Sequence, residues 1–98
     1  METITLNDGT VVNGHILEDG YGQMIFVYLD GMNLMQGFML MSDPAKTSVM
    51  TAENHGVEHV YNGFTEIISI NSEFGNCNLT MRKPVQQIQA TEPEVVSE

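Results

Sequence analysis

Closely spaced turn signals divide this chain into short runs that are rich in Ile, Val, Thr and aromatic residues. The signals are Asn7-Asp8-Gly9, Asn13-Gly14, Asp30-Gly31, Asn62-Gly63 and Gly75-Asn76. Gly and Asn tolerate the positive φ angles that tight hairpin turns require, and branched and aromatic side chains favour strands. The spacing of these signals therefore predicts a chain built mostly of antiparallel strands.

The first two signals allow two interpretations. Strands are expected at about residues 3–6 and 10–17, but either signal could form the hairpin between strands. If Asp8-Gly9 turns the chain, Asn13-Gly14 is a bulge within a longer second strand.

Residues 24–29, MIFVYL, form a run of six consecutive apolar side chains. A strand with one solvated face would alternate instead, so the run predicts a central strand that is covered on both faces. Further strands are expected at 47–52 and 57–61, followed by a hairpin of 64–73 with 77–82.

Half of the eight methionines lie in one segment, residues 31–41. Met32, Met35 and Met39 are spaced at i, i+3 and i+7, which predicts a short amphipathic helix. Gly37 weakens such a helix by about 1 kcal/mol relative to Ala, and Ser42-Asp43-Pro44 ends it because the residue before Pro disfavours helical φ and ψ.

Two interpretations account for these methionines. Flexible thioethers fill irregular gaps in a core, so the helix could simply pack on the sheet. The apolar run is broader than one side of a short helix can hide, however, and exposed apolar patches mark contact surfaces. The candidates for partner binding are Met32, Met35, Phe38 and Met39.

The expected fold is α+β and β-rich, with six to seven mostly antiparallel strands in a sandwich or partly closed barrel and one short helix. Residues 1–83 are expected to form a single globular domain, which suits a chain of 98 residues with 42% hydrophobic composition. Residues 84–98 hold three glutamates, two prolines and no basic residue, which predicts a flexible acidic tail.

Charge restricts the classes of partner. Thirteen acidic and three basic residues give a net charge of −10, which repels phosphate backbones and anionic lipid surfaces. Direct binding to nucleic acid or to membranes is therefore not expected, and no export signal or membrane-spanning run is recognised. The single cysteine, Cys77, excludes an internal disulfide.

No motif predicts a catalytic, cofactor or metal site. His55 and His59 stand four residues apart, but Gly56 and the strand-like surroundings remove the helical geometry that would bring both imidazoles to one metal. Asp8, Asp19 and Asp30 each sit next to a glycine in a turn, where a carboxylate commonly accepts local backbone hydrogen bonds. The sequence therefore predicts a protein that is not an enzyme.

Residues 4–17, ITLNDGTVVNGHIL, resemble the start of Sm-like RNA-binding proteins, and DGMNL at 30–34 is similar to their Asp…Met-Asn element. This resemblance implies a small Sm-like module. The chain lacks the later Arg-Gly element of that family and its charge opposes RNA binding, so we attribute the likeness to shared turn chemistry.

The segments METITLNDGT, DGMNLMQGF and YNGFTEIISINSEF, with NLTMRK, resemble small acidic proteins encoded by phages and prophages of Gram-positive bacteria. The resemblance implies a virion component, or a prophage product in the bacterial host cytoplasm. The first functional hypothesis is a structural or assembly protein that contacts itself or other virion proteins. The second is an acidic, DNA-mimicking inhibitor of a host defence nuclease.

Overall fold

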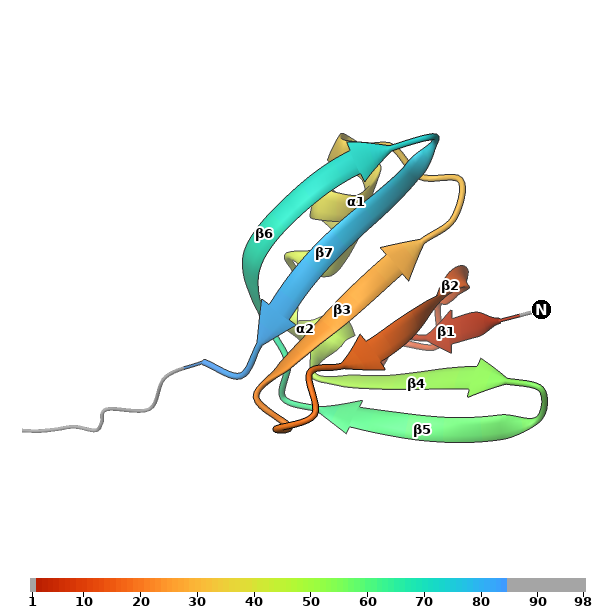
Figure 1. Cartoon of the computed structure of the whole chain (residues 1–98), viewed down its shortest axis with the longest axis vertical. Coiled ribbons are helices and arrows are strands. Elements are labelled where there is room, and N and C mark those ends of the chain that lie inside the picture. Colours follow the sequence, from red (N-terminus) through yellow and green to blue (C-terminus); the bar gives the residue numbers. More distant parts are fainter. Residues whose placement is uncertain (1, 85–98) are drawn as a thin grey trace, which may run out of the picture.

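The computed structural model describes residues 2–84, which form seven strands and two short helices (Figure 1). In chain order the elements are β1 (Thr3–Thr5), β2 (Val11–Glu18), β3 (Met24–Leu29), α1 (Leu34–Met41), α2 (Pro44–Thr47), β4 (Val49–Asn54), β5 (Val57–Asn62), β6 (Glu66–Glu73) and β7 (Asn76–Arg82). All strand pairs are antiparallel, and the strand order is β5-β4-β1-β2-β3-β7-β6.

The β1–β2 hairpin turns at Asp8-Gly9, and Gly14 lies inside β2, so the long second strand is confirmed, but no shift of register marks the bulge expected at Asn13-Gly14. At Gly14 the strand changes partners. Residues up to Asn13 pair with β1, whereas Gly14 and the residues after it pair with β3. A Cβ at Gly14 would overlap the carbonyl oxygen of Tyr28, so the close approach of β3 requires glycine.

Strand β2 therefore belongs to both halves of the sheet, one made of β5, β4, β1 and β2 and the other of β2, β3, β7 and β6. Buried side chains from both halves, from α1 and from two connecting segments form one core: Ile4, Leu6, Ile16, Ile25, Val27, Leu29, Met41, Met50, Tyr61, Phe64, Cys77, Leu79 and Met81. The sheet does not close, since β5 and β6 are its edges within residues 2–84. The predicted α+β, β-rich sandwich is confirmed.

The expectation that the MIFVYL strand is covered on both faces is wrong. Strand β3 is interior to the sheet, but burial alternates along it. Ile25, Val27 and Leu29 face the core, while Phe26 and Tyr28 on the other face are only half-buried. Both helices lie behind the sheet in the view of Figure 1, so neither covers this second face.

Asn33 is the N-cap of helix α1 and forms a capping box, which was not predicted. The Asn33 side chain accepts a hydrogen bond from the Gln36 backbone N–H, and the Gln36 side chain accepts one from the Asn33 N–H. The helix ends at Ser42, as predicted. Pro44 then occupies the first turn of α2, with Asp43 as its N-cap, where the absence of a proline N–H has no cost.

Later boundaries differ by a few residues from those expected. Strand β4 begins at Val49, because Thr47 belongs to α2, and β6 begins at Glu66, because Phe64 is a core residue before the strand. The tail expected at 84–98 lies, from residue 85 on, outside the described residues. No helix within residues 2–84 is long and apolar enough to cross a membrane.

Candidate functional site

Helix α1 turns Gly37 and Met41 towards the sheet but leaves several bulky apolar side chains in contact with solvent. Gly37 and Met41 are buried, and α1 packs against β6, β7 and α2. Four apolar side chains outside this buried stripe, which we call the α1 row, remain uncovered: Leu34 is 44% exposed, Met35 64%, Phe38 47% and Met39 67%. An uncovered row of this kind is the usual mark of a contact surface.

The α1 row contains three of the four residues predicted to bind a partner, namely Met35, Phe38 and Met39. Met32 is not part of it, because it precedes the N-cap and packs half-buried against the core. Leu34 was not among the residues predicted to bind a partner, although its i, i+4 relation to Phe38 could have indicated it. The core receives Met41, Met50 and Met81 instead.

The close contact between α1 and β7 depends on Gly37. A Cβ at this position would overlap the Cys77 Sγ and would lie 2.9 Å from the Cys77 Cβ. The helix therefore rests on the sheet through backbone and a small side chain. Burial raises the pKa of the Cys77 thiol, so this group is held neutral beneath the helix.

The segment that carries the α1 row has no charged side chain. Residues 31–42 contain no acidic or basic side chain, and α1 has no acidic residue in its first turn and no basic residue in its last turn. The chain as a whole carries a net charge of −10. The α1 row is therefore a neutral patch on a strongly acidic protein.

A further exposed apolar side chain, that of Phe74, lies in the turn between β6 and β7. Phe74 forms the corner of the β6–β7 turn with a positive φ of 54°, and its side chain is 95% exposed. The Gly31 N–H donates to the Asn76 Oδ1 over 3.2 Å, which fixes this turn beside the chain that leads into α1. A bulky residue rarely adopts this conformation, so Phe74 occupies a strained position without any packing inside the fold.

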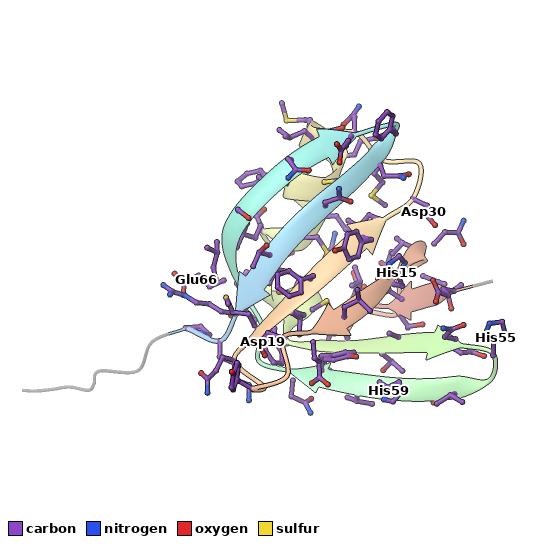
Figure 2. The ribbon with its side chains drawn as sticks, viewed as in Figure 1. His15, Asp19, Asp30, His55, His59 and Glu66 are labelled. Atoms are coloured by element: carbon purple, nitrogen blue, oxygen red, sulfur yellow. The ribbon has the colours of Figure 1, made fainter. Side chains whose placement is uncertain are left out.

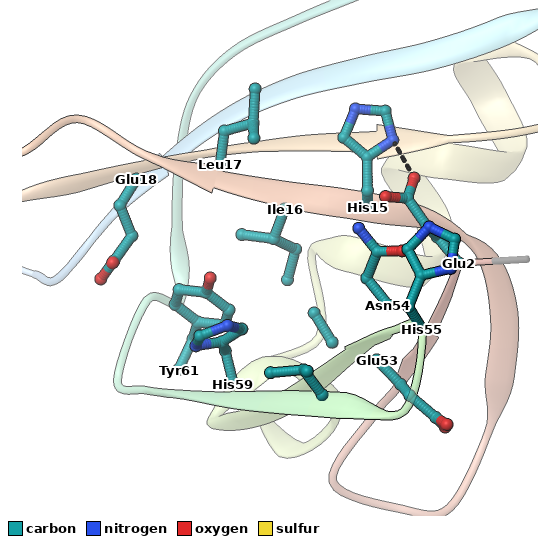
Figure 3. A pocket seen from close by; sticks show the side chains of 12 residues that line it. Glu2, His15, Ile16, Leu17, Glu18, Glu53, Asn54, His55, His59 and Tyr61 are labelled. Atoms are coloured by element: carbon teal, nitrogen blue, oxygen red, sulfur yellow. Dashed lines mark ion pairs between the residues drawn. The ribbon is translucent and has the colours of Figure 1, made fainter.

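A groove of about 520 Å³ lies between the second part of β2 and the β4–β5 hairpin (Figure 3). Its lining includes all three histidines of the chain, His15, His55 and His59. Glu2, Glu18 and Tyr61 also contribute. Imidazoles and carboxylates around a concavity are the ordinary components of acid–base or metal sites, so their orientation decides what the groove can do.

The histidines of the groove do not converge. Figure 3 shows His15 and Ile16 on opposite sides of β2, with only Ile16 directed into the groove. The His15 Nδ1 lies 3.1 Å from the Glu2 carboxylate, and the His15 ring stacks on Tyr28 at 4.6 Å between centroids.

His55 lies at the tip of the β4–β5 hairpin and His59 lies along β5 (Figure 2). Among residues 2–84 there is no group of three His, Cys, Asp or Glu side chains that could hold a metal ion. Burial, together with the charge of Glu18, raises the pKa of Tyr61 and keeps its hydroxyl protonated. The groove therefore presents isolated polar groups rather than an assembled catalytic set.

Two of the turn carboxylates, Asp19 and Asp8, have the local role expected for them, whereas no such hydrogen bond is found for Asp30 within residues 2–84. The Asp19 side chain accepts backbone hydrogen bonds from Tyr21 at 2.9 Å, from Gln23 at 3.3 Å and from Met24 at 3.2 Å. These bonds, that of Tyr21 first, lower the pKa of Asp19. Asp8 accepts from the Thr10 N–H at 3.0 Å, and its pKa is lowered in the same way.

Comparison with protein-family models, with curated proteins and with solved structures finds no match to this chain. The function is therefore inferred from the surfaces of the protein itself.

Proposed function

We propose that this protein is a non-enzymatic assembly protein that contacts further copies of itself through the α1 row. The observation that carries the proposal is the exposure of Met35 and Met39, each about two-thirds open to solvent on a helix whose opposite side is fixed to the sheet. Burying these side chains against another protein removes apolar surface from water, which favours association. Methionine adapts its shape to its neighbours, which suits such a contact.

Charge favours a second copy of the chain as the partner. A basic partner would be attracted to the acidic parts of the surface, and the neutral segment 31–42 offers it no ion pair. Two copies repel each other through their net charge of −10, and this repulsion is smallest where a neutral patch meets a neutral patch. A two-fold axis through the α1 row would pair each apolar side chain with apolar side chains of the other copy.

The size of the row indicates how strong this contact is. Helix α1 has eight residues, so it is about 12 Å long, and a stable dimer usually buries about 800 Å² on each partner. The helix alone falls short of that area. Phe74, exposed in the turn that the Asn76 side chain joins to Gly31, adds further exposed apolar surface. A weak contact of this kind becomes effective when many copies are held together, as in a multisubunit assembly.

The resemblance to phage and prophage proteins agrees with a multisubunit setting, and we extend the proposal to an assembly role in a virion or in a host cell that carries a prophage. In that setting the α1 row would contact other virion proteins as well as copies of this chain. The surface chemistry described above applies to either contact.

The experiment measures molar mass by light scattering across a concentration series, for the wild type and for Met39→Glu. Wild type is expected to gain mass as concentration rises, and Met39→Glu is expected to stay monomeric because a carboxylate is costly to bury. Val60→Glu is the matched control because it adds the same charge away from α1. Val60 is 55% exposed on β5, at one edge of the sheet, whereas α1 packs against β6 at the opposite edge. A wild type that stays monomeric throughout, or equal effects of both variants, would contradict the proposal.

A second candidate is the acidic inhibitor of a host defence nuclease. Glu53 and Glu58 lie directly opposite each other on β4 and β5, and both are exposed. Like charges in such a pair are destabilising, so a basic partner that neutralised them would regain free energy. The test is inhibition of a purified defence nuclease as a function of salt, with Glu58→Gln as the variant. If the protein does not inhibit the nuclease at low salt, this role is excluded.

A further inference from the structure

The sheet has one face that no helix covers. In Figure 1 the helices lie behind the sheet, while the front of β2, β3, β7 and β6 is open. The antiparallel register fixes which side chains share this face, because residues directly opposite each other point to the same side.

Two neighbouring cross-strand rows on this face combine aromatic and neutral polar side chains. One row runs His15, Tyr28, Asn78 and Asn71, and the next runs Leu17, Phe26, Thr80 and Ser69. The aromatic and apolar members lie on β2 and β3, and the amides and hydroxyls lie on β7 and β6. A depression of about 300 Å³ lies over the polar part. Its lining consists of Phe26, Tyr28, Ser69, Asn71, Asn78, Leu79, Thr80 and one carboxylate, that of Glu73.

The polar and aromatic groups are held in position. The His15 ring stacks on Tyr28 with an angle of 22° between the rings, and the His15 Nδ1 lies 3.1 Å from the Glu2 carboxylate. The Asn78 Nδ2 donates to the Asn71 Oδ1 at 3.4 Å, which leaves further donors and acceptors of both amides free for a ligand.

We propose that this face binds a neutral oligosaccharide. A pyranose ring has apolar C–H faces, which stack on Tyr and Phe, and a rim of hydroxyls, which both donate to and accept from amides and hydroxyls. Both kinds of group meet at the border between β3 and β7. Neighbouring strands are about 4.8 Å apart, close to the length of one hexose unit, so successive sugars can follow successive strands.

The charges around this face disfavour the other ligand that stacks on aromatic rings. Single-stranded nucleic acid requires cations along its backbone, and the chain has three Lys and Arg residues against a net charge of −10. The cation of this face, Arg82, is engaged by Glu66 through two contacts of 3.2 Å. A neutral ligand avoids the repulsion that a phosphate backbone would meet.

This inference is independent of the proposed assembly role, because the α1 row lies on the other side of the sheet. The test follows backbone amide NMR shifts of the full chain during titration with cellohexaose, chitohexaose or maltohexaose, and with oligothymidylate as the charged alternative. At least one hexasaccharide is expected to shift the resonances of Phe26, Tyr28, Asn71 and Asn78 at millimolar concentration.

Two variants sharpen the test. Tyr28→Ala removes the stacking ring and is expected to abolish the saturable change in NMR shifts. Asn71→Ala removes one exposed amide and is expected to weaken binding roughly threefold to tenfold. Asn71 is exposed, so its variant keeps the fold. Asn62→Ala on the exposed surface of β5 is the matched control and is expected to leave the affinity unchanged. No shift with any hexasaccharide, shifts elsewhere, equal effects of Asn71→Ala and Asn62→Ala, or a response to oligothymidylate alone would overturn the proposal.

Discussion

Gly37 of α1 lies directly over Cys77 of β7, so close that any side chain at position 37 would overlap the thiol sulfur. This contact sets the distance of the helix from the sheet and decides which side of α1 faces solvent. We therefore expect Gly37→Ala to destabilise the fold. Overpacking costs about 1–3 kcal/mol. The higher helix propensity of Ala recovers about 1 kcal/mol of this cost, so a net loss of stability is expected.

Chemical denaturation measures this effect, and a double-mutant cycle tests its cause. Combined with Cys77→Ala, the Gly37→Ala change is expected to cost less than it does alone, because the sulfur that it would overlap has been removed. A Gly37→Ala protein more stable than wild type would show that the helix can move away from β7 at no cost.

The Cys77 thiol is expected to be unreactive in the native protein. The side chain is fully buried, and burial raises its pKa, so both access and thiolate formation are suppressed. Reaction with a disulfide reagent at pH 8 should be slow in buffer and fast in denaturant. Equal rates in the two conditions would mean that α1 detaches readily from the sheet.

Gly14→Ala is expected to be more damaging than substitution of a turn glycine. Its Cβ would overlap a main-chain oxygen of Tyr28, which cannot rotate away, so we expect a loss of about 3 kcal/mol or more. Gly22→Ala is the control, since Gly22 also has a positive φ but open space around it, and backbone strain there costs about 1 kcal/mol. Similar unfolding free energies for both variants would contradict the requirement at position 14.

The Asp19 carboxylate is expected to make stability depend on pH in the acidic range. Its pKa in the folded protein is below the ordinary value of 3.8, so its contribution is fully present above that value and is lost as pH falls through the lowered pKa. Asp19→Asn should therefore lower the melting temperature at pH 7, and the difference from wild type should shrink below pH 3.8. A difference that stays constant with pH would assign the effect to something other than ionisation.

Phe74→Asn is expected to stabilise the monomer and to weaken association. Asn adopts a positive φ more readily than Phe, so the β6–β7 turn should gain about 1 kcal/mol, while the exposed ring is lost from the surface beside α1. His55→Asn is the matched comparison, because His55 has the same φ of 54° at the tip of the β4–β5 hairpin. A loss of stability in Phe74→Asn would mean that the ring packs within the fold.

The strands could be predicted because their signals are local. Turn residues such as Asp8-Gly9 and Asn62-Gly63 act through their own backbone preferences, and these operate before any tertiary contact forms. The burial of β3 could not be predicted in the same way. Six consecutive apolar residues indicate an interior strand, but whether a second layer covers Phe26 and Tyr28 depends on where α1 packs.

The candidate contact surface was predicted in part for a similar reason. The spacing of Met32, Met35 and Met39 predicts a helix with an apolar stripe, and such a stripe ordinarily faces the core. Here Gly37 takes that place, because its lack of a side chain allows the closest approach to β7. Helix α2 was not predicted, because Pro44 was taken only as the end of the first helix, although a proline can also begin a helix.

The pairing of β3 with β7 joins the early part of the fold to its last strand, with both helices and three other strands between them in the chain. During synthesis on the ribosome, β3 can pair with β2 early, but its other edge stays without β7 until Arg82 has left the exit tunnel. Pairings this distant in sequence form late and slowly. The nascent chain consequently spends most of its synthesis with an incomplete sheet that exposes apolar side chains and an unpaired strand edge, a stage at which chaperones would act.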